Sequence, residues 1–336
     1  MANSDSEIRL RSSARTSIGQ VRENNEDTVQ LWAEDQYVLA VVADGMGGAV
    51  AGEEASRIAV EAVQQEMTSP GNRETLPALN DDLLIDKLCE SIRSANLNIV
   101  RRAAANPELR GMGTTITLAM VRSTNAIVAH VGDSRAYLVD STSRRITQIT
   151  ADHTFVEALV AAGHLTPDQA SEHPMRNVLY RALGQHEDVD VDIYEAHLRA
   201  GDRLVLCSDG LTRHVRPAEI TAIVAEAVHP DIASEELIAL ANERGGEDNV
   251  SVIVVALDGE PPAADEVDTD VIFTDGDTVK LQDPRIATAV AQAIRDAGLD
   301  PDKTLNVNNA LDQVDCCAER SGGLGAEGRD TFNWKN

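Results

Sequence analysis

Aromatic residues are scarce in this 336-residue sequence: Phe, Trp and Tyr make up 3% of it, so a core must be built mainly from aliphatic side chains. No stretch approaches the roughly 18 consecutive apolar residues that a membrane-spanning helix needs. The segment from Met1 to Ser13 lacks the apolar run of a signal peptide. The four cysteines form no CxxC pair and no disulfide framework. These absences predict a soluble cytoplasmic protein without a membrane partner.

Basic residues are also few, since 29 Lys and Arg face 56 Asp and Glu and the formal net charge is -27. The electrostatic field of this negative charge repels the phosphates of nucleic acids and of anionic lipids, so we expect neither as a partner. Composition leaves two interpretations of the acids open. They form a self-repelling, soluble surface, or some of them cluster around cations.

Apolar runs typical of β-strands recur from near residue 29 to residue 257 and are interrupted by pairs of amphipathic helices. The expected strands are 37–43, 115–121, 126–131, 135–139, 145–149, 189–196, 203–207 and 250–257. The expected helices are 52–67, 82–105, 217–228 and 234–243. Because strands and helices come in blocks, we predict an α+β fold, a β-sandwich of two antiparallel sheets flanked by helix pairs (α-β-β-α).

One domain is expected over residues 1–257, and three segments depart from its pattern. Residues 151–185 are helix-prone but broken by Gly and Pro, and we expect them to form a flap inserted into the strand series. Residues 258–283 are expected to be an acidic linker. Residues 284–336 form a C-terminal extension, which is helical over 284–297 and Gly-rich at its end. This extension is a docking or autoregulatory segment, or else a dispensable solubilising tail.

Acidic residues stand where predicted strands begin or end. Asp44-Gly45 and Asp209-Gly210 each follow a buried strand, and Gly132-Asp133 ends another. Asp248 immediately precedes the last strand and Asp27 precedes the first. Each acid alone is an ordinary turn or cap residue. If these ends converge, however, the carboxylates repel one another unless a cation neutralises them, and Mg²⁺ and Mn²⁺ prefer such oxygen ligands.

An ordered set of motifs resembles the metal-dependent protein phosphatases of the protein phosphatase 2C type. The motifs are Arg22-x-x-x-Glu26-Asp27, Asp44-Gly-Met-Gly-Gly48, Gly113-Thr-Thr115, Gly132-Asp-Ser-Arg135, Ser208-Asp-Gly210 and Asp248-Asn249. Each motif is weak alone, but the ordered set is specific and covers roughly residues 8–257. Asp152-His153 and the segment from Arg176 to Gly184 resemble the bacterial branch of that family.

The resemblance implies a role for each matching residue. Asp44, the Gly45 carbonyl, Asp209 and Asp248 match the ligands of two Mn²⁺ or Mg²⁺ ions. Asp27 matches an acid that holds a metal-bound water, and Glu26 supports it. Asp133 together with Asp209 matches a weaker third metal site, and Arg22 matches the residue that clamps the substrate phosphate. A hydroxide that bridges the metals would attack phosphorus while these charges offset those of the phosphoryl oxygens.

Met46 departs from the pattern, because many eukaryotic relatives have at this position a His that is proposed to protonate the leaving group. Methionine cannot donate a proton, so the general acid stays unassigned, and His153 is a candidate only through its proximity to the flap. No Cys-x5-Arg loop is present, which argues against a cysteine-nucleophile phosphatase.

The resemblance therefore predicts a monomeric enzyme that hydrolyses phosphoserine and phosphothreonine on proteins and opposes a bacterial Ser/Thr kinase. Two alternatives remain open from the residues: a catalytically silent phosphoprotein-binding module of the same fold, and a structural domain stabilised by Ca²⁺. Their tests are phosphopeptide binding without turnover in Mn²⁺, and a preference for Ca²⁺ over Mn²⁺.

Overall fold

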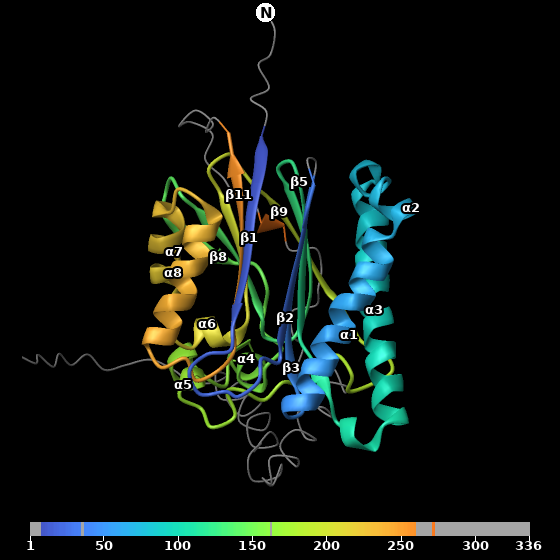
Figure 1. The fold of residues 1–336 in the computed structure, drawn as a ribbon. Helices are drawn as coiled ribbons and strands as arrows, with labels where there is room; N and C mark the ends of the chain where they lie inside the picture. Colours follow the sequence, from blue (N-terminus) through green and yellow to red (C-terminus); the bar gives the residue numbers. More distant parts are fainter. Residues whose placement is uncertain (1–7, 35–36, 162, 260–270, 273–336) are drawn as a thin grey trace, which may run out of the picture.

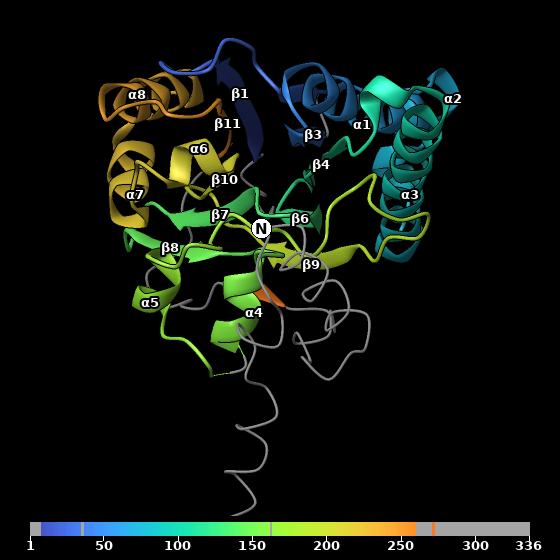
Figure 2. The ribbon, with the colours of Figure 1, turned by 90° about the horizontal axis from the view of Figure 1, so that it is seen from below.

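A computed structural model of the chain describes residues 8–34, 37–161, 163–259 and 271–272. Two antiparallel sheets lie against each other, and helices cover the outer face of each, as Figures 1 and 2 show. This arrangement confirms the predicted α+β sandwich. Most of the expected linker 258–283 and the whole expected extension 284–336 lie outside the described residues.

The first sheet contains the two ends of the main domain side by side. Its strands, in sheet order, are β1 (Arg9–Ser17), β11 (Val250–Asp258), β10 (Arg203–Cys207), β7 (Arg135–Asp140) and β8 (Arg145–Gln148). Sequence analysis missed β1. Its Arg and Ser side chains are half-exposed on a sheet edge, so no apolar run marks the strand.

The second sheet has inner strands that are buried on both faces. Its order is β12 (Val271–Ile272), β9 (Asp192–His197), β6 (Asn125–Val131), β5 (Ile116–Arg122), β3 (Tyr37–Met46) and β2 (Asp27–Ala33), and β4 (Gly113–Thr114) pairs with β3. Val38 and Val42 of β3 face the other sheet, while Leu39 and Val41 face the helices. Burial on both faces explains why β3 is continuously apolar.

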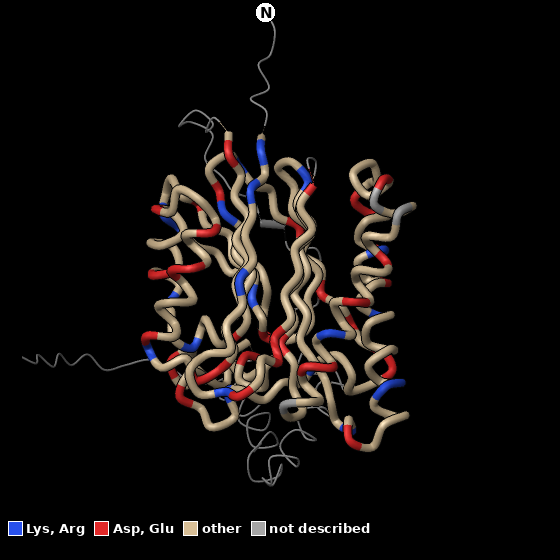
Figure 3. Tube along the Cα trace, viewed as in Figure 1, with Lys and Arg blue, Asp and Glu red and all other residues tan. Residues whose placement is uncertain are grey.

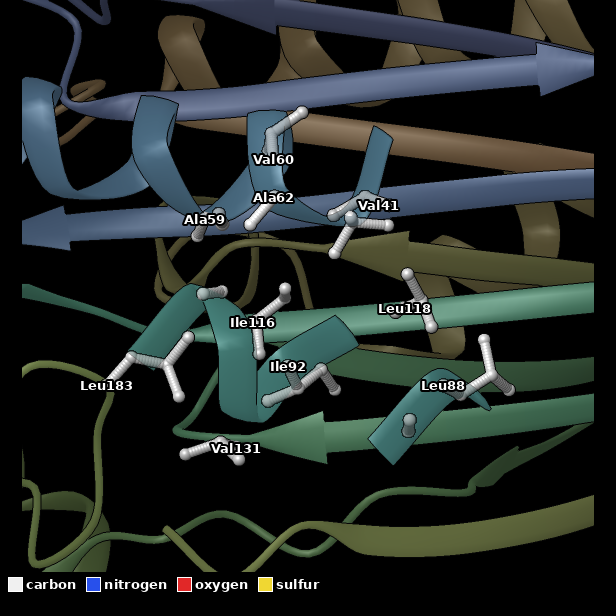
Figure 4. Packing of buried hydrophobic residues seen from close by; sticks show 14 of the residues in the cluster. Val41, Ala59, Val60, Ala62, Leu88, Ile92, Ile116, Leu118, Val131 and Leu183 are labelled. Carbon is white, nitrogen blue, oxygen red and sulfur yellow. The ribbon is translucent and has the colours of Figure 1, made fainter. Parts of the chain in front are cut away.

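The helices pack in pairs, as predicted. The second sheet is covered by α1 (Ala49–Thr68) and α3 (Asp81–Ala105), and the first by α7 (Pro217–Glu226) and α8 (Pro230–Glu243). Figure 4 shows Ala59, Ile92 and Leu88 of the first pair against Ile116 and Leu118 of β5. Shorter elements are α2 (Pro70–Arg73), α6 (Asp209–Thr212) and the 3-10 turns Leu76–Ala78 and Pro107–Leu109.

The segment predicted as a flap contains two short helices, α4 (Phe155–Ala161) and α5 (Pro167–Ser171). It has a small apolar cluster of its own, with Phe155, Met175 and Tyr180 buried in it. An isolated bridge between Thr154 and Leu179 closes the segment at its base. The expected linker holds one described pairing, because β12 adds to the sheet beside β9.

Candidate metal centre

The acids predicted as metal ligands lie at one end of the sandwich. Asp27 begins β2 and is the register partner of Asp44, near the end of β3. Asp133 follows β6, Asp209 follows β10, and Asp248 precedes β11. Figure 3 shows acidic residues gathered at the lower ends of the central strands. The antiparallel order therefore brings residues from five distant stretches of sequence to one place.

Asp27 ties the two sheets together at this end. Its Oδ2 accepts hydrogen bonds from Ser208 Oγ at 2.8 Å and from Ser251 Oγ at 2.7 Å. Asp27 belongs to the second sheet, whereas Ser208 directly follows β10 and Ser251 lies in β11 of the first sheet. Neither serine was given a role from the sequence, although Ser208 stands in one of the quoted motifs. These two bonds fix the Asp27 carboxylate beside the end of the first sheet.

Asp44 is held through its backbone, so its carboxylate is left free for a ligand. Its N–H donates to Thr115 Oγ1 at 3.0 Å, and its carbonyl accepts from the N–H of Thr115 at 2.8 Å. Among the described residues, no group donates a hydrogen bond to its side chain. The next residue, Gly45, donates a hydrogen bond from its N–H to the Glu26 carbonyl at 3.1 Å.

Only glycine fits at position 45, because two backbone segments approach it closely. A Cβ there would lie 2.1 Å from the Gly52 carbonyl oxygen and 2.7 Å from that of Glu26. Gly52 is confined mainly by a side chain, since its Cβ would lie 1.9 Å from Glu26 Oε2 and 2.9 Å from the backbone carbonyl carbon of Gly45. The N–H of Glu26 donates to Asn249 Oδ1 at 2.8 Å, which places Glu26 beside the loop that carries Asp248.

Two arginines contact the remaining acids. Arg22 donates to Asp248 Oδ2 at 2.8 Å, and its side chain is 46% exposed. Arg213 donates to the same oxygen at 3.0 Å and also to Asp209 Oδ2. Arg22 was predicted to lie here, whereas Arg213 was not. Its signal in the sequence was the four-residue spacing from Asp209, which allows a helical ion pair.

Asp133 lies in a turn that is anchored to the base of the flap. The N–H of Gly132 donates to His153 Nδ1 at 3.0 Å, and the N–H of His153 donates to the Gly132 carbonyl at 2.7 Å. The other ring nitrogen of His153, Nε2, lies 2.9 Å from Asp192 Oδ2. Because Nδ1 accepts a hydrogen bond, Nε2 must carry the proton and donate it to Asp192. His153 is 1% exposed, so it is a structural link rather than a proton donor to substrate.

The electrostatics show how poorly these acids tolerate ionisation together. Burial raises the pKa of Asp27 to about 7, with further contributions from the charges of Asp209 and Asp248. Burial, and then the charges of Asp27, Asp209, Asp133 and Asp248, raise the pKa of Asp44 well above its usual range. Burial and the charge of Asp209 do the same for the pKa of Asp133. A divalent cation would remove this repulsion.

The residues present fit a cation of this kind. Asp209 Oδ1 is buried and has no hydrogen-bond partner within the described part of the chain. Carboxylates and carbonyls are the oxygen donors that Mn²⁺ and Mg²⁺ bind. Across the described residues, no three acidic, His or Cys side chains already stand in ligand geometry. Two of the acids instead direct an oxygen at Arg213.

The amino-acid sequence is similar to those of known protein phosphatases. The family model described as protein phosphatase 2C matches residues 16–241. The serine/threonine phosphatase stp of Listeria innocua is 37% identical over 211 residues, which are 62% of this chain and 81% of that protein. The serine/threonine protein phosphatase PstP of Mycobacterium tuberculosis is 42% identical over 204 residues, 60% of this chain but only 36% of that protein.

A solved structure shows the same similarity in three dimensions. The catalytic domain of PstP, in complex with two manganese ions, superposes with a TM-score of 0.64 and 36% identity, over 75% of this chain and 100% of that one. Helices that could cross a membrane are absent from the described part of the present chain.

Proposed function

The chain belongs to the protein phosphatase 2C family, as a serine/threonine protein phosphatase of the bacterial type, and we propose that it works with two divalent cations held at the strand ends. The observation that carries this proposal is a group of mutually repelling carboxylates at the strand ends, buried at Asp27 and half-buried at Asp44, Asp133 and Asp209. Carboxylates that lie close together without enough neighbouring positive charge destabilise a fold, so this group favours a site for cations.

Asp44, Asp209, Asp248 and the Gly45 carbonyl would hold the two cations, which we propose to be Mn²⁺ or Mg²⁺. The PstP structure with manganese supports Mn²⁺. When bound, these cations would lower the pKa of water and offset charge on the phosphoryl oxygens. Asp133, with Asp209, would serve a weaker third site.

The other residues of this site would orient water and substrate. Asp27, held by two serine hydroxyls, is placed to accept a hydrogen bond from the attacking water. Glu26 supports the loop beneath it. Arg22 is the exposed cation at the rim, and its planar guanidinium suits the two oxygens of a phosphate. Neither Met46 nor buried His153 can protonate the leaving group, so we assign that proton to solvent.

The activity is tested by hydrolysis of p-nitrophenyl phosphate and of phosphoserine and phosphothreonine peptides. We expect turnover in Mn²⁺ and none after treatment with EDTA. Asp44→Ala and Asp209→Ala should abolish turnover, while Asp82→Ala, in the exposed first turn of α3, should leave it intact. Undiminished turnover in the first two variants would refute the metal mechanism. Binding of phosphopeptide without turnover would instead favour the silent binding module.

We also propose the cellular setting of the enzyme. We infer that the substrates are phosphoproteins of a bacterial Ser/Thr kinase, and that the enzyme is a cytoplasmic monomer. The free thiols of Cys89 and Cys207, both buried, support a reducing compartment. We retain residues 1–257 as the catalytic domain, 151–185 as its flap, and 284–336 as a docking extension. Unchanged substrate choice after deletion of residues 259–336 would refute the docking role.

A further inference from the structure

Arg213 lies within the group of acids that would hold the cations. It caps the C-terminal end of α6, and its guanidinium spans two carboxylates that belong to different elements. One nitrogen donates to Asp209 Oδ2 and another donates to Asp248 Oδ2 at 3.0 Å. The side chains of Asp209, Asp248 and Arg213 are 17%, 15% and 31% exposed, so these ion pairs are only partly screened by water.

The guanidinium occupies oxygens that a cation would need. Asp209 Oδ2 and Asp248 Oδ2 both accept from Arg213, whereas buried Asp209 Oδ1 has no partner among the described residues. The planar guanidinium holds several N–H donors in a fixed geometry, so it can donate to two carboxylates at once and orient both of them. In this structure Arg213 therefore does part of what a divalent cation would do: it links Asp209, the first residue of α6, to Asp248, which precedes β11, and offsets their charge.

We propose that Arg213 is a built-in counter-cation, which holds Asp209 and Asp248 together in the metal-free protein and competes with a divalent cation for them. This inference rests on the proposed function, because it takes both acids to be metal ligands. It assigns Arg213 a positioning role rather than contact with the reacting atoms. The arginine stabilises this end of the fold in the metal-free protein, and it weakens cation affinity because it must move away from Asp209 and Asp248 when the cation binds.

The test is a calorimetric titration of the metal-free full chain with Mn²⁺ in the absence of substrate. The proteins are wild type, Arg213→Gln, Arg213→Lys and the control Arg216→Gln. Arg216 loses the same formal charge three residues away, and its side chain is 81% exposed and paired with Glu219. We expect Arg213→Gln to bind Mn²⁺ roughly tenfold more tightly than wild type, the size expected when one like charge leaves a partly exposed site. The Mn²⁺ affinity of Arg213→Lys should lie between those of wild type and Arg213→Gln. The Mn²⁺ affinity of Arg216→Gln should equal that of wild type.

Thermal unfolding distinguishes this role from simple stabilisation. In EDTA the Tm of Arg213→Gln should fall below that of wild type, and saturating Mn²⁺ should restore it to the wild-type value. A merely structural arginine would lower Tm equally with and without Mn²⁺ and would not tighten binding. Equal or weaker Mn²⁺ binding by Arg213→Gln would overturn the proposal. If that variant does not fold, wild-type affinity in Arg213→Lys would overturn it.

The two proposals fail in different ways. If wild type binds Mn²⁺ and Asp209→Asn does not, the metal centre stands whatever Arg213→Gln shows. If none of the proteins binds Mn²⁺, the proposed metal mechanism is wrong, and the counter-cation role is wrong with it.

Discussion

Replacing Asp44 by Asn should stabilise the metal-free protein while it removes metal binding and activity. The Asp44 side chain is an unusual carboxylate, because it is surrounded by other acids and receives no hydrogen bond from the described residues. Burial and the charges of Asp27, Asp209, Asp133 and Asp248 raise its pKa well above its usual range. Asparagine has nearly the same shape and no charge, so the substitution removes the repulsion without leaving a cavity.

The size of the effect can be bounded from Coulomb's law. Two carboxylates about 5 Å apart repel by about 3 kcal/mol at an effective dielectric constant of about 20. Partial protonation of Asp44 already relieves some of this energy, so we expect a gain of about 2 kcal/mol in the free energy of unfolding at pH 8. For a domain of this size, that gain corresponds to a rise in Tm of roughly 4–8 °C.

The assay is thermal and urea unfolding in EDTA, with Asp152→Asn as the matched control. Asp152 is a buried carboxylate, whereas Asp44 is half-buried, and Asp152 accepts hydrogen bonds from Arg135 Nε at 2.9 Å and Arg135 Nη2 at 2.7 Å. Loss of that paired charge should therefore destabilise the protein, by about 3 kcal/mol or more. The gain in Asp44→Asn should fade as pH falls and Asp44 becomes protonated in wild type. If Asp44→Asn lowers Tm at pH 8 as Asp152→Asn does, the carboxylates do not destabilise one another.

Two further predictions concern the same strand ends. The pKa of Asp27 is raised from 3.8 to about 7. Between these two pH values the folded metal-free protein holds a proton that the unfolded chain has released, so the free energy of unfolding should fall as pH rises. Urea midpoints in EDTA should therefore decline from about pH 6 to about pH 8. Buried His130 has the opposite effect, because its pKa is lowered from 6.5 to about 3 and the unfolded chain binds the proton that the folded protein does not. That effect acts only below about pH 6.5. A flat profile would contradict this. Separately, Gly45→Ala should cost about 1–3 kcal/mol and weaken Mn²⁺ binding, because its Cβ meets backbone on two sides. Gly71→Ala, with open space around it, is the control and should keep wild-type stability and affinity.

Sequence patterns predicted the interior of this fold better than its edges. β3 is apolar at successive positions because both of its faces are buried, and α1 and α3 carry apolar residues on one side because only one side packs on the sheet. β1 shows neither pattern. It is held by pairing with β11 over a separation of more than two hundred residues, and local composition contains no information on such a partner.

The acids of the site could be foreseen because each stands beside a glycine or a strand end, whereas their partners could not. Ser208 and Ser251 reach Asp27 only because β10 and β11 end beside β2 once the sheets pack together. Arg213 could be linked to Asp209 by its helical spacing, but its second bond, to Asp248, depends on where β11 begins. Sequence patterns thus identified the acids and Arg22, and missed Arg213 and the serine hydroxyls that balance the acids with it.

This difference has a physical origin. The strand ends bring together carboxylates whose repulsion opposes folding, and the apolar cores between the sheets and under the helices must outweigh it. Anything that offsets the charge locally, whether a serine hydroxyl on Asp27, a guanidinium on Asp209 and Asp248, or a divalent cation, stabilises the fold by the same mechanism. A counter-charge supplied by the chain itself therefore reduces the free energy that metal binding can release. For this reason the stability of the metal-free protein and its affinity for Mn²⁺ should vary in opposite directions when Arg213 is replaced.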